Sequence, residues 1–210
     1  MKQITVIGAS KGVGLETVKL AIDRGLKVVA FSRNLDDYPV DSPRLTKMRG
    51  DITIQDDLEK AIKNSDVVVL TIGGGITFKP VTLYSKGTTT LLNAMKKLKV
   101  QPLLIAVTGF GAGESKGHSG FLLNTFLFGI LLKTGYKDKT TQEEIIKKSN
   151  TSWIIVRPAV LNDGSLTGQY RVIDTLDVKP KNISRKDVAD FILKQAEQPD
   201  HLNKTPLLTY

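Results

Sequence analysis

The sequence predicts an α/β fold: a doubly wound parallel sheet with helices on both faces, in a single domain over residues 1–210. Residues 4–14 carry a short apolar strand that runs directly into a glycine-rich turn, and a helical pattern follows at once. Further along, apolar runs rich in β-branched residues alternate with amphipathic stretches, which is typical of parallel strands buried on both faces. The length of 210 residues suits one such domain.

The first strand–turn–helix unit is the most informative segment. The turn reads Gly-Ala-Ser-Lys-Gly-Val-Gly and places Gly8, Gly12 and Gly14 between the first strand and a helix over residues 15–22. A second strand over residues 27–31 completes a βαβ unit. Unpaired N–H groups at the start of a helix attract anions, and glycines let the backbone approach a phosphate. We therefore predict a dinucleotide-binding site in a Rossmann-type domain.

The later elements continue the alternation. We expect strands over residues 46–49, 66–72, 102–107 and 152–157, helices over 55–63, 81–98 and from a cap at Ser184 to about 197, and an edge strand over 205–210. In such a sheet, ligands lie beyond the carboxyl ends of the strands. The segments that follow the strands should therefore meet around one crevice, namely 8–14, 32–33, 51–52, 71–75, 108–113 and 157–161.

The end of the second strand predicts which cofactor binds. An acidic residue there favours NAD, because it accepts from the ribose 2′-OH and repels a 2′-phosphate. This chain has Ser32 and Arg33 instead, and Lys11 adds a second cation, so we expect NADP in preference to NAD. Asp51 and Ile52 suit the adenine amino edge and ring, although Asp51 would equally serve as a cap for the next helix.

Composition narrows the other possibilities. The net charge is +9, but the lysines are scattered and only 6% of residues are aromatic, so we expect no nucleic-acid partner. No apolar run reaches the ~18–20 residues of a membrane span, and Met1 leads almost at once into a strand, so we expect neither a span nor a signal peptide. The absence of cysteine fits a cytoplasmic location. His118 and His201 are expected in exposed loops, with no metal site.

The glycine-rich turn resembles that of the short-chain dehydrogenase/reductase superfamily. The Y-x-x-x-K pair of its classical members is absent, because Tyr84, Tyr136 and Tyr170 are followed four residues later by Thr88, Thr140 and Asp174. The chain is similar to atypical, NmrA-like members, and most similar to the biliverdin-IXβ reductase/flavin reductase branch over nearly its whole length. This resemblance rests on Gly8, Gly14, Ser32-Arg33, Gly50-Asp51-Ile52, Ser85-x-Gly87, Asn93–Lys96, Arg157-Pro158 and Leu166-Thr167-Gly168-x-Tyr170.

The resemblance implies roles for individual residues. They are Gly8, Ser10, Lys11, Gly12, Val13 and Gly14 for the pyrophosphate, Ser32 and Arg33 for the 2′-phosphate, Asp51 and Ile52 for adenine, Thr71 and Gly73 for the riboses, and Thr108 and Pro158 at the nicotinamide. Two positions depart from the flavin-reductase pattern, which has a serine where this chain has Gly109 and a histidine where it has Val160. The acceptor therefore stays open.

The function expected from these residues is hydride transfer from NADPH to a flavin, quinone or similar planar acceptor. Thr108 is the candidate catalytic residue. An equally good interpretation is that Thr108 has only a structural role at the end of its strand. Gly109, Phe110, Phe121 and Val160 are expected on the substrate side, within residues 109–135 and 158–184. Phe110, Phe121 and Phe126 are placed to stack on a flavin ring.

Three further interpretations stay open. The apolar segment 121–132 would form a buried or dimer-forming helix or a lid over the substrate, in a monomer or homodimer. Lys139 with Glu143 or Glu144 is expected to form an ordinary surface ion pair. A non-catalytic, NADP-binding redox sensor is the alternative function, and a sugar-nucleotide epimerase or dehydratase is a third.

Overall fold

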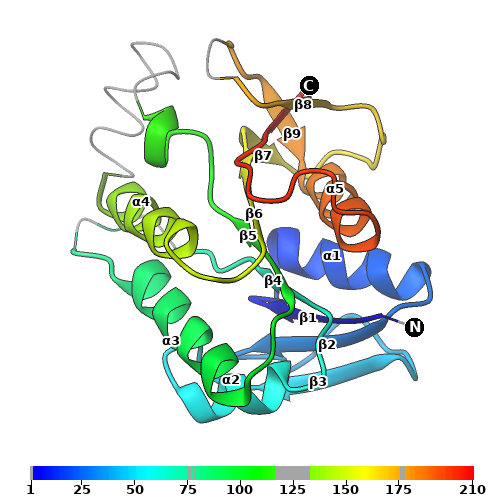
Figure 1. The fold of residues 1–210 in the computed structure, drawn as a ribbon. Helices are drawn as coiled ribbons and strands as arrows, with labels where there is room; N and C mark the ends of the chain where they lie inside the picture. Colours follow the sequence, from blue (N-terminus) through cyan, green and yellow to red (C-terminus); the bar gives the residue numbers. More distant parts are fainter. Residues whose placement is uncertain (1, 75–76, 78, 117–132, 176–177) are drawn as a thin grey trace.

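A computed structural model describes residues 2–74, 77, 79–116, 133–175 and 178–210 (Figure 1). The strands are β1 (Gln3–Ile7), β2 (Lys27–Ser32), β3 (Leu45–Arg49), β4 (Val67–Leu70), β5 (Leu103–Val107), β6 (Trp153–Pro158), β7 (Val160–Asn162), β8 (Arg171–Ile173), β9 (Asn182–Ser184) and β10 (Leu207–Thr209). The helices are α1 (Gly12–Asp23), α2 (Gln55–Ile62), α3 (Leu83–Leu98), α4 (Lys133–Lys147) and α5 (Arg185–Glu197), with a 3₁₀ turn at Gly113–Ser115.

The main sheet has the strand order β3-β2-β1-β4-β5-β6-β10-β8. Strands β1 to β6 and β10 are parallel, and β8 joins β10 in the antiparallel direction. The chain leaves β1 outward through β2 and β3 and then returns to place β4 on the other side of β1. In open α/β sheets, ligands bind beyond the carboxyl ends of the strands at such a reversal. The predicted doubly wound fold is confirmed.

Helices cover both faces of the sheet, as Figure 1 shows. Side chains alternate along each strand, so that Val28 and Ala30 of β2 join one core while Val29 and Phe31 join the other. The first core packs against α1 and α5, and the second packs against α2, α3 and α4. The predicted cap of the last helix is also confirmed, because the Ser184 hydroxyl accepts from the Asp187 N–H at 2.9 Å.

The prediction fails at the C-terminal side of the sheet. The expected edge strand near the C-terminus, β10, lies inside the sheet between β6 and β8. We missed β8 because a three-residue strand carries almost no periodic signal, and β7 and β9 were missed for the same reason. The apolar segment 121–132, which includes Phe121 and Phe126, lies outside the described residues, and so does His118.

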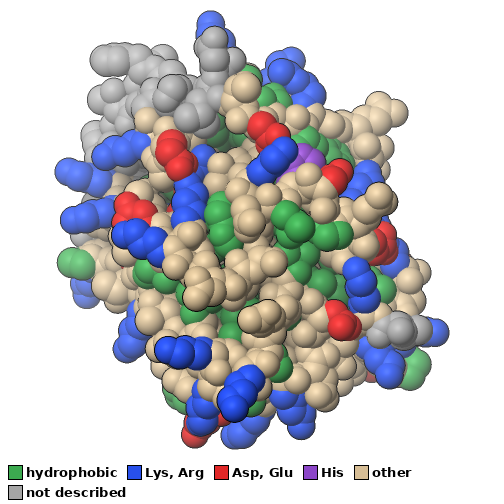
Figure 2. Space-filling view, in the orientation of Figure 1, with side chains coloured by type: hydrophobic (Ala, Val, Ile, Leu, Met, Phe, Trp, Pro, Cys, Tyr) green, Lys and Arg blue, Asp and Glu red, His purple; other side chains and the backbone are tan. Residues whose placement is uncertain are grey.

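Charge is spread around the molecule rather than gathered into one patch on the face that Figure 2 shows. Lysine and arginine side chains lie around its rim, with acidic side chains among them. Within the described residues, no helix has the length and apolar character that crossing a bilayer requires. The same residues contain no cluster of three or more histidine, cysteine or acidic side chains that could hold a metal ion.

Candidate functional site

The glycine-rich turn packs at backbone distance against the end of β4. Gly8 has a φ of +90°, which favours glycine, and a Cβ added there would lie 2.7 Å from the Thr71 carbonyl oxygen. A Cβ on Gly14 would collide with the Gly8 carbonyl oxygen and lie 2.5 Å from Thr71 Oγ1. The Thr71 hydroxyl donates to the Ile7 carbonyl oxygen at 2.9 Å. Only glycine at both positions lets the turn and the start of α1 lie this close to the end of β4.

The N-terminus of α1 lacks a capping hydrogen bond from its own N-cap residue. That residue is Lys11, whose side chain makes no such bond, and the first turn of the helix contains no acidic residue. The first N–H groups of α1 therefore keep their hydrogen-bonding capacity for an anion. Val13 is buried within the turn, while Lys11 is exposed.

Arg185 lies beside the glycine-rich turn, which we did not predict from the sequence. Its Nε lies 3.8 Å from the position of a Cβ on Gly12, and its Nη1 donates to Asp163 Oδ1 at 2.7 Å. The sequence suggested only the start of a helix at this position, because no local pattern brings together residues so distant in the chain. The guanidinium of Arg185, paired with Asp163, therefore lies beside the α1 N-terminus.

The ends of β2 and β3 lie at the same edge of the sheet as the end of β1. Ser32 ends β2 and Arg33 follows it as an exposed side chain. Asp51 Oδ1 accepts from both the N–H and the hydroxyl of Thr53, each at 2.8 Å. These bonds lower the pKa of Asp51, and the nearby charges of Arg33 and Lys86 lower it further. The carboxylate of Asp51 and the guanidinium of Arg33 are thus near enough to interact electrostatically.

Ile52 is 5% exposed and packs beneath α3, where a Cβ on Gly87 would lie 2.9 Å from its Cδ1. Farther along the edge, Gly73 is exposed just after β4 and Pro158 is buried in β6. The segments that the sequence assigned to the crevice therefore do follow the strands of one parallel sheet, on the same edge.

Thr108, at the end of β5, is buried, and its hydroxyl donates to Glu143 Oε1 at 2.7 Å. Glu143 is 1% exposed and also accepts from Arg157, at 3.1 Å from Nε and 2.5 Å from Nη2. The expectation that Glu143 pairs with Lys139 on the surface is therefore wrong. Helical spacing alone could not show which face of α4 lies against the sheet.

Arg157 Nη2 also donates to Glu114, which is bonded by Lys147 as well. Burial would raise the pKa of Glu114, but these two hydrogen bonds outweigh it and lower the pKa to about 2. Arg157 thus joins the end of β6 to α4 and to the 3₁₀ turn through two carboxylates.

The substrate-side expectations have mixed outcomes. Phe110 is 3% exposed and packs in the core with α5, so the prediction that it stacks on an acceptor ring is wrong for this structure. Its ring is part of the apolar core, an alternative that the glycine-rich surroundings concealed. Val160 is 54% exposed and Gly109 has a φ of +155°, and the substrate-side role of both residues stays a prediction.

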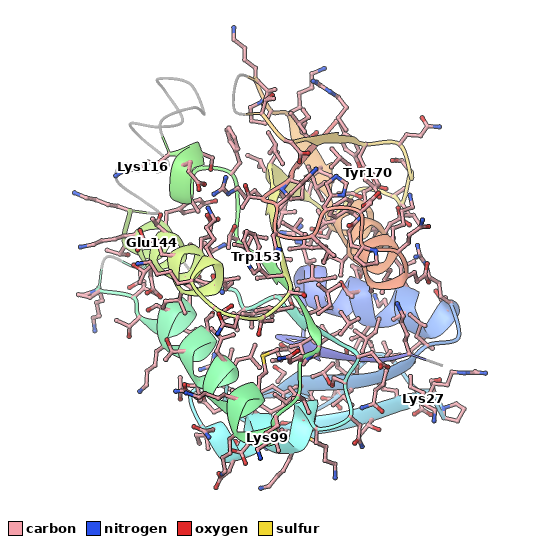
Figure 3. The ribbon with its side chains drawn as sticks, viewed as in Figure 1. Lys27, Lys99, Lys116, Glu144, Trp153 and Tyr170 are labelled. Carbon is pink, nitrogen blue, oxygen red and sulfur yellow. The ribbon has the colours of Figure 1, made fainter. Side chains whose placement is uncertain are left out.

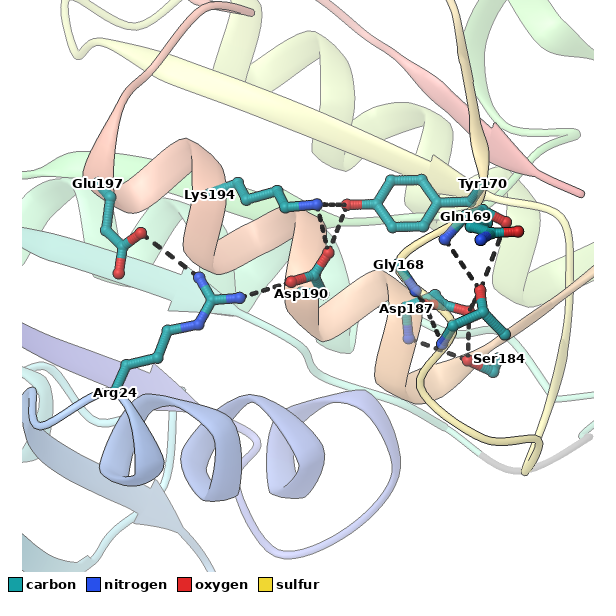
Figure 4. Close-up of polar contacts among 10 residues, drawn as sticks. Arg24, Gly168, Gln169, Tyr170, Ser184, Asp187, Asp190, Lys194 and Glu197 are labelled. Atoms are coloured by element: carbon teal, nitrogen blue, oxygen red, sulfur yellow. Dashed lines mark hydrogen bonds and ion pairs between the residues drawn. The ribbon is translucent and has the colours of Figure 1, made fainter.

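A polar network fixes the loop before β8 to α5 (Figure 4). Asp187 accepts from the N–H groups of Thr167 at 2.9 Å and Gly168 at 2.8 Å, and the Tyr170 hydroxyl donates to Asp190 at 2.8 Å. Tyr170 lies beside α5 in Figure 3, with its ring edge against Phe191. The Leu-Thr-Gly-x-Tyr block therefore fastens this loop to α5.

His201 is not the exposed loop residue that we expected. Only 18% of its side chain is exposed, its Nδ1 lies 2.6 Å from Asp200 Oδ1, and its ring packs edge-on against Phe191. A lone histidine among polar residues carries no signal for such packing.

Comparisons with known proteins agree with this geometry. The sequence profile of the NAD(P)H-binding family matches residues 8–199. An uncharacterized chloroplastic protein of Arabidopsis thaliana is 29% identical over 95% of this chain and 73% of its own length. The uncharacterized protein YwnB of Bacillus subtilis is 28% identical over 96% of this chain and 95% of its own length.

Solved structures share the fold. ChuY of Escherichia coli, described as an anaerobillin reductase, has a TM-score of 0.84 at 24% identity, over 99% of this chain and 97% of its own. A short-chain dehydrogenase/reductase of Veillonella parvula, solved in complex with NADP, has a TM-score of 0.84 at 17% identity, over 100% of this chain and 94% of its own. The chain belongs to the NAD(P)H-binding family, and its fold is of the Rossmann type.

Proposed function

We propose that this protein is an NADPH-dependent reductase that transfers hydride to a flavin, quinone or similar planar acceptor. The observation that carries the proposal is the uncapped start of α1, held at backbone distance from β4 by Gly8 and Gly14. A pyrophosphate bound there would accept from the first N–H groups of the helix. Lys11 and Arg185 would add positive charge from either side of the turn.

The preference for NADP rests on Arg33. It follows β2, where a 2′-phosphate would lie, and no acidic residue occupies the end of that strand. Asp51 lies within the electrostatic reach of Arg33 and would instead bind the adenine amino group, with Ile52 beneath the ring. Thr71 and Gly73 would border the riboses, and Thr108 and Pro158 the nicotinamide.

Reduction of a planar acceptor also needs residues that place the acceptor next to the cofactor. Hydride transfer asks the protein mainly for placement and exclusion of water, because the nicotinamide supplies the chemistry. The exposed Val160 and the braced loop at Gly168 would border the acceptor within residues 158–184. The other segment expected on the substrate side, residues 109–135, includes residues 117–132, which lie outside the described residues. We expect a monomer or homodimer in a reducing compartment such as the cytoplasm.

The assay follows NADPH absorbance with FMN, riboflavin and menadione as trial acceptors. The proposal expects NADPH oxidation with at least one of them, and faster oxidation with NADPH than with NADH. Saturable NADPH binding with no oxidation for any acceptor would contradict the reductase and favour the redox sensor. The NADPH preference is tested with Arg33→Ala. Its matched control is Arg44→Ala, because Arg44 precedes β3 at the amino-terminal end of the neighbouring strand, whereas Arg33 follows the carboxyl end of β2.

A further inference from the structure

A cluster of one lysine and two tyrosines lies where β4 and β5 end, and the proposed chemistry has not used it. This lysine–tyrosine cluster consists of Lys139 and Tyr136 on α4 and Tyr84 on α3. The ammonium of Lys139 donates to the carbonyl oxygen of Thr108. Its Nζ lies 5.4 Å from the ring centroid of Tyr84 and 5.5 Å from that of Tyr136. Both distances are within the range of a cation–π contact.

The two tyrosine hydroxyls locate the cluster relative to the sheet. A Cβ on Gly74, just beyond β4, would lie 2.8 Å from the Tyr84 hydroxyl oxygen. A Cβ on Gly109, just beyond β5, would lie 2.7 Å from the Tyr136 hydroxyl oxygen. The cluster therefore covers the carboxyl ends of both strands, next to Thr108, where the proposed function places the nicotinamide.

The cluster is held in place by contacts that need no ligand. Asp138, which is 6% exposed, accepts from the N–H groups of Tyr84 at 2.8 Å and Ser85 at 3.3 Å. This carboxylate fastens the start of α3 to α4 and so fixes Tyr84 opposite Lys139. One turn further along α4, Glu143 holds the Thr108 hydroxyl, and Thr108 in turn accepts from Lys139 through its carbonyl.

The ammonium of Lys139 has no carboxylate within ion-pair distance among the residues that the structure describes. Glu143 is the nearest acidic influence on it, and that carboxylate is bonded to Arg157 and Thr108. Burial lowers the pKa of Lys139 to about 8, and the charge of Glu143 only partly opposes this shift. A group with a pKa near the working pH both holds a proton and releases it readily.

We propose that Lys139 is the proton donor of the reduction. This inference rests on the proposed function. The C4–H bond of the reduced nicotinamide breaks, and the hydrogen leaves with its electron pair to the acceptor. The acceptor gains an anionic oxygen or nitrogen, which bonds to a proton as an N–H bond of Lys139 breaks. The neutral amine then regains a proton from water. Tyr84 and Tyr136 are positioning residues that hold the ammonium over the strand ends.

The test uses menadione as the acceptor, because hydride transfer to a quinone leaves a basic oxyanion that must gain a proton. Turnover at saturating NADPH is measured from about pH 6 to about pH 10. Wild type should lose rate above about pH 8, as the ammonium loses its proton. Lys139→Met should lower the rate at neutral pH by about 100-fold and remove the fall above pH 8. Lys139→Arg should also be slow and flat, because a guanidinium keeps its proton.

Lys137→Met is the matched control, since Lys137 is an exposed neighbour on the same helix. It should keep both the rate and the pH profile of wild type. NADPH fluorescence titration of each variant separates binding from turnover. A Lys139→Met enzyme that turns over within about threefold of wild type, or that still loses rate above pH 8, would overturn the inference. So would a defect confined to NADPH affinity.

Failure of the proposed function has a different signature. Wild type would then oxidise no NADPH with menadione or with either flavin, and Lys139 would have no reduction to serve. Addition of ethylammonium to Lys139→Ala provides a second measurement on a functional wild type. The proton-donor role expects partial recovery of menadione turnover that follows the concentration of the protonated amine. No recovery, together with a wild-type pH profile in Lys139→Ala, would contradict it.

Discussion

Replacing Glu143 by glutamine should destabilise the fold, because Glu143 is the buried anion that compensates Arg157. The two side chains are 1% and 2% exposed, and three hydrogen bonds converge on Glu143 at 2.5, 2.7 and 3.1 Å. Hydrogen bonds to a charged group contribute about 1 kcal/mol more than neutral ones, so loss of the charge costs roughly 3 kcal/mol. Glu114 stays as a partner of Arg157, but its side chain is 59% exposed and offsets at most about 1 kcal/mol.

The net expectation for Glu143→Gln is a loss of about 2–3 kcal/mol in the free energy of unfolding. In a chain of this size, that loss corresponds to a melting temperature lower by roughly 5–10 °C. Urea unfolding followed by circular dichroism measures the change. The control is Glu144→Gln on the next residue of α4, which is exposed and labelled in Figure 3, and which should stay within about 0.5 kcal/mol of wild type.

A double substitution makes the reasoning refutable. If the cost comes from an uncompensated buried charge, Glu143→Leu combined with Arg157→Met should be less destabilised than the sum of the two single variants. Equal stability of Glu143→Gln and Glu144→Gln would refute the account of the pair. So would strict additivity of the two apolar substitutions.

Gly14→Ala should lower NADPH affinity at least tenfold and lower the free energy of unfolding by about 1–3 kcal/mol, because its Cβ would lie 2.5 Å from Thr71 Oγ1. Its control is Gly135→Ala, whose Cβ has room beside Tyr84 and which should leave the melting temperature unchanged or raise it. Asp187→Asn should lower the free energy of unfolding in urea by about 2 kcal/mol, because an amide cannot accept from Thr167, Gly168 and Tyr210 together. Its control is Asp174→Asn, which removes a surface ion pair and should change the free energy of unfolding little. The pKa of Lys139 is about 8 in the folded protein, below its ordinary value of 10.5. Between these two values the unfolded chain binds more protons than the folded protein, so the free energy of unfolding should rise with pH in that window. Lys139→Met should show a smaller rise, and an unchanged pH dependence in this variant would contradict the burial of the ammonium.

The sequence predicted the parts of the fold that local patterns encode. The β-branched runs and the glycine-rich turn were enough for the parallel sheet and for the N-terminus of α1. Contacts between distant segments were not predictable in this way. Two examples are the proximity of Arg185 to Gly12 and the hydrogen bond between Thr108 and Glu143. Both depend on how helices pack against the sheet, which a short sequence motif does not indicate. Phe110 was misassigned because an aromatic side chain in a glycine-rich loop fits both a core and a ligand site.

The lysine–tyrosine cluster is the clearest case of this limit. A search for Tyr and Lys four residues apart finds no pair, whereas the structure joins Lys139 to tyrosines on two helices. Only the packing of α3 against α4 through Asp138 brings the three side chains together. Spacing within one helix could not indicate a cluster that spans two.

The most direct test of the central claim is a calorimetric titration of the purified protein with NADPH and with NADH. We expect NADPH to bind through the open N-terminus of α1 and to bind more tightly than NADH. Arg33→Ala should weaken NADPH binding by about 10- to 100-fold and leave NADH within about twofold, because it removes a charge-assisted contact to the 2′-phosphate. Arg44→Ala should change neither. No binding of either nucleotide at millimolar concentration would contradict the account, and equal losses for both in Arg33→Ala would remove the basis for the NADP preference.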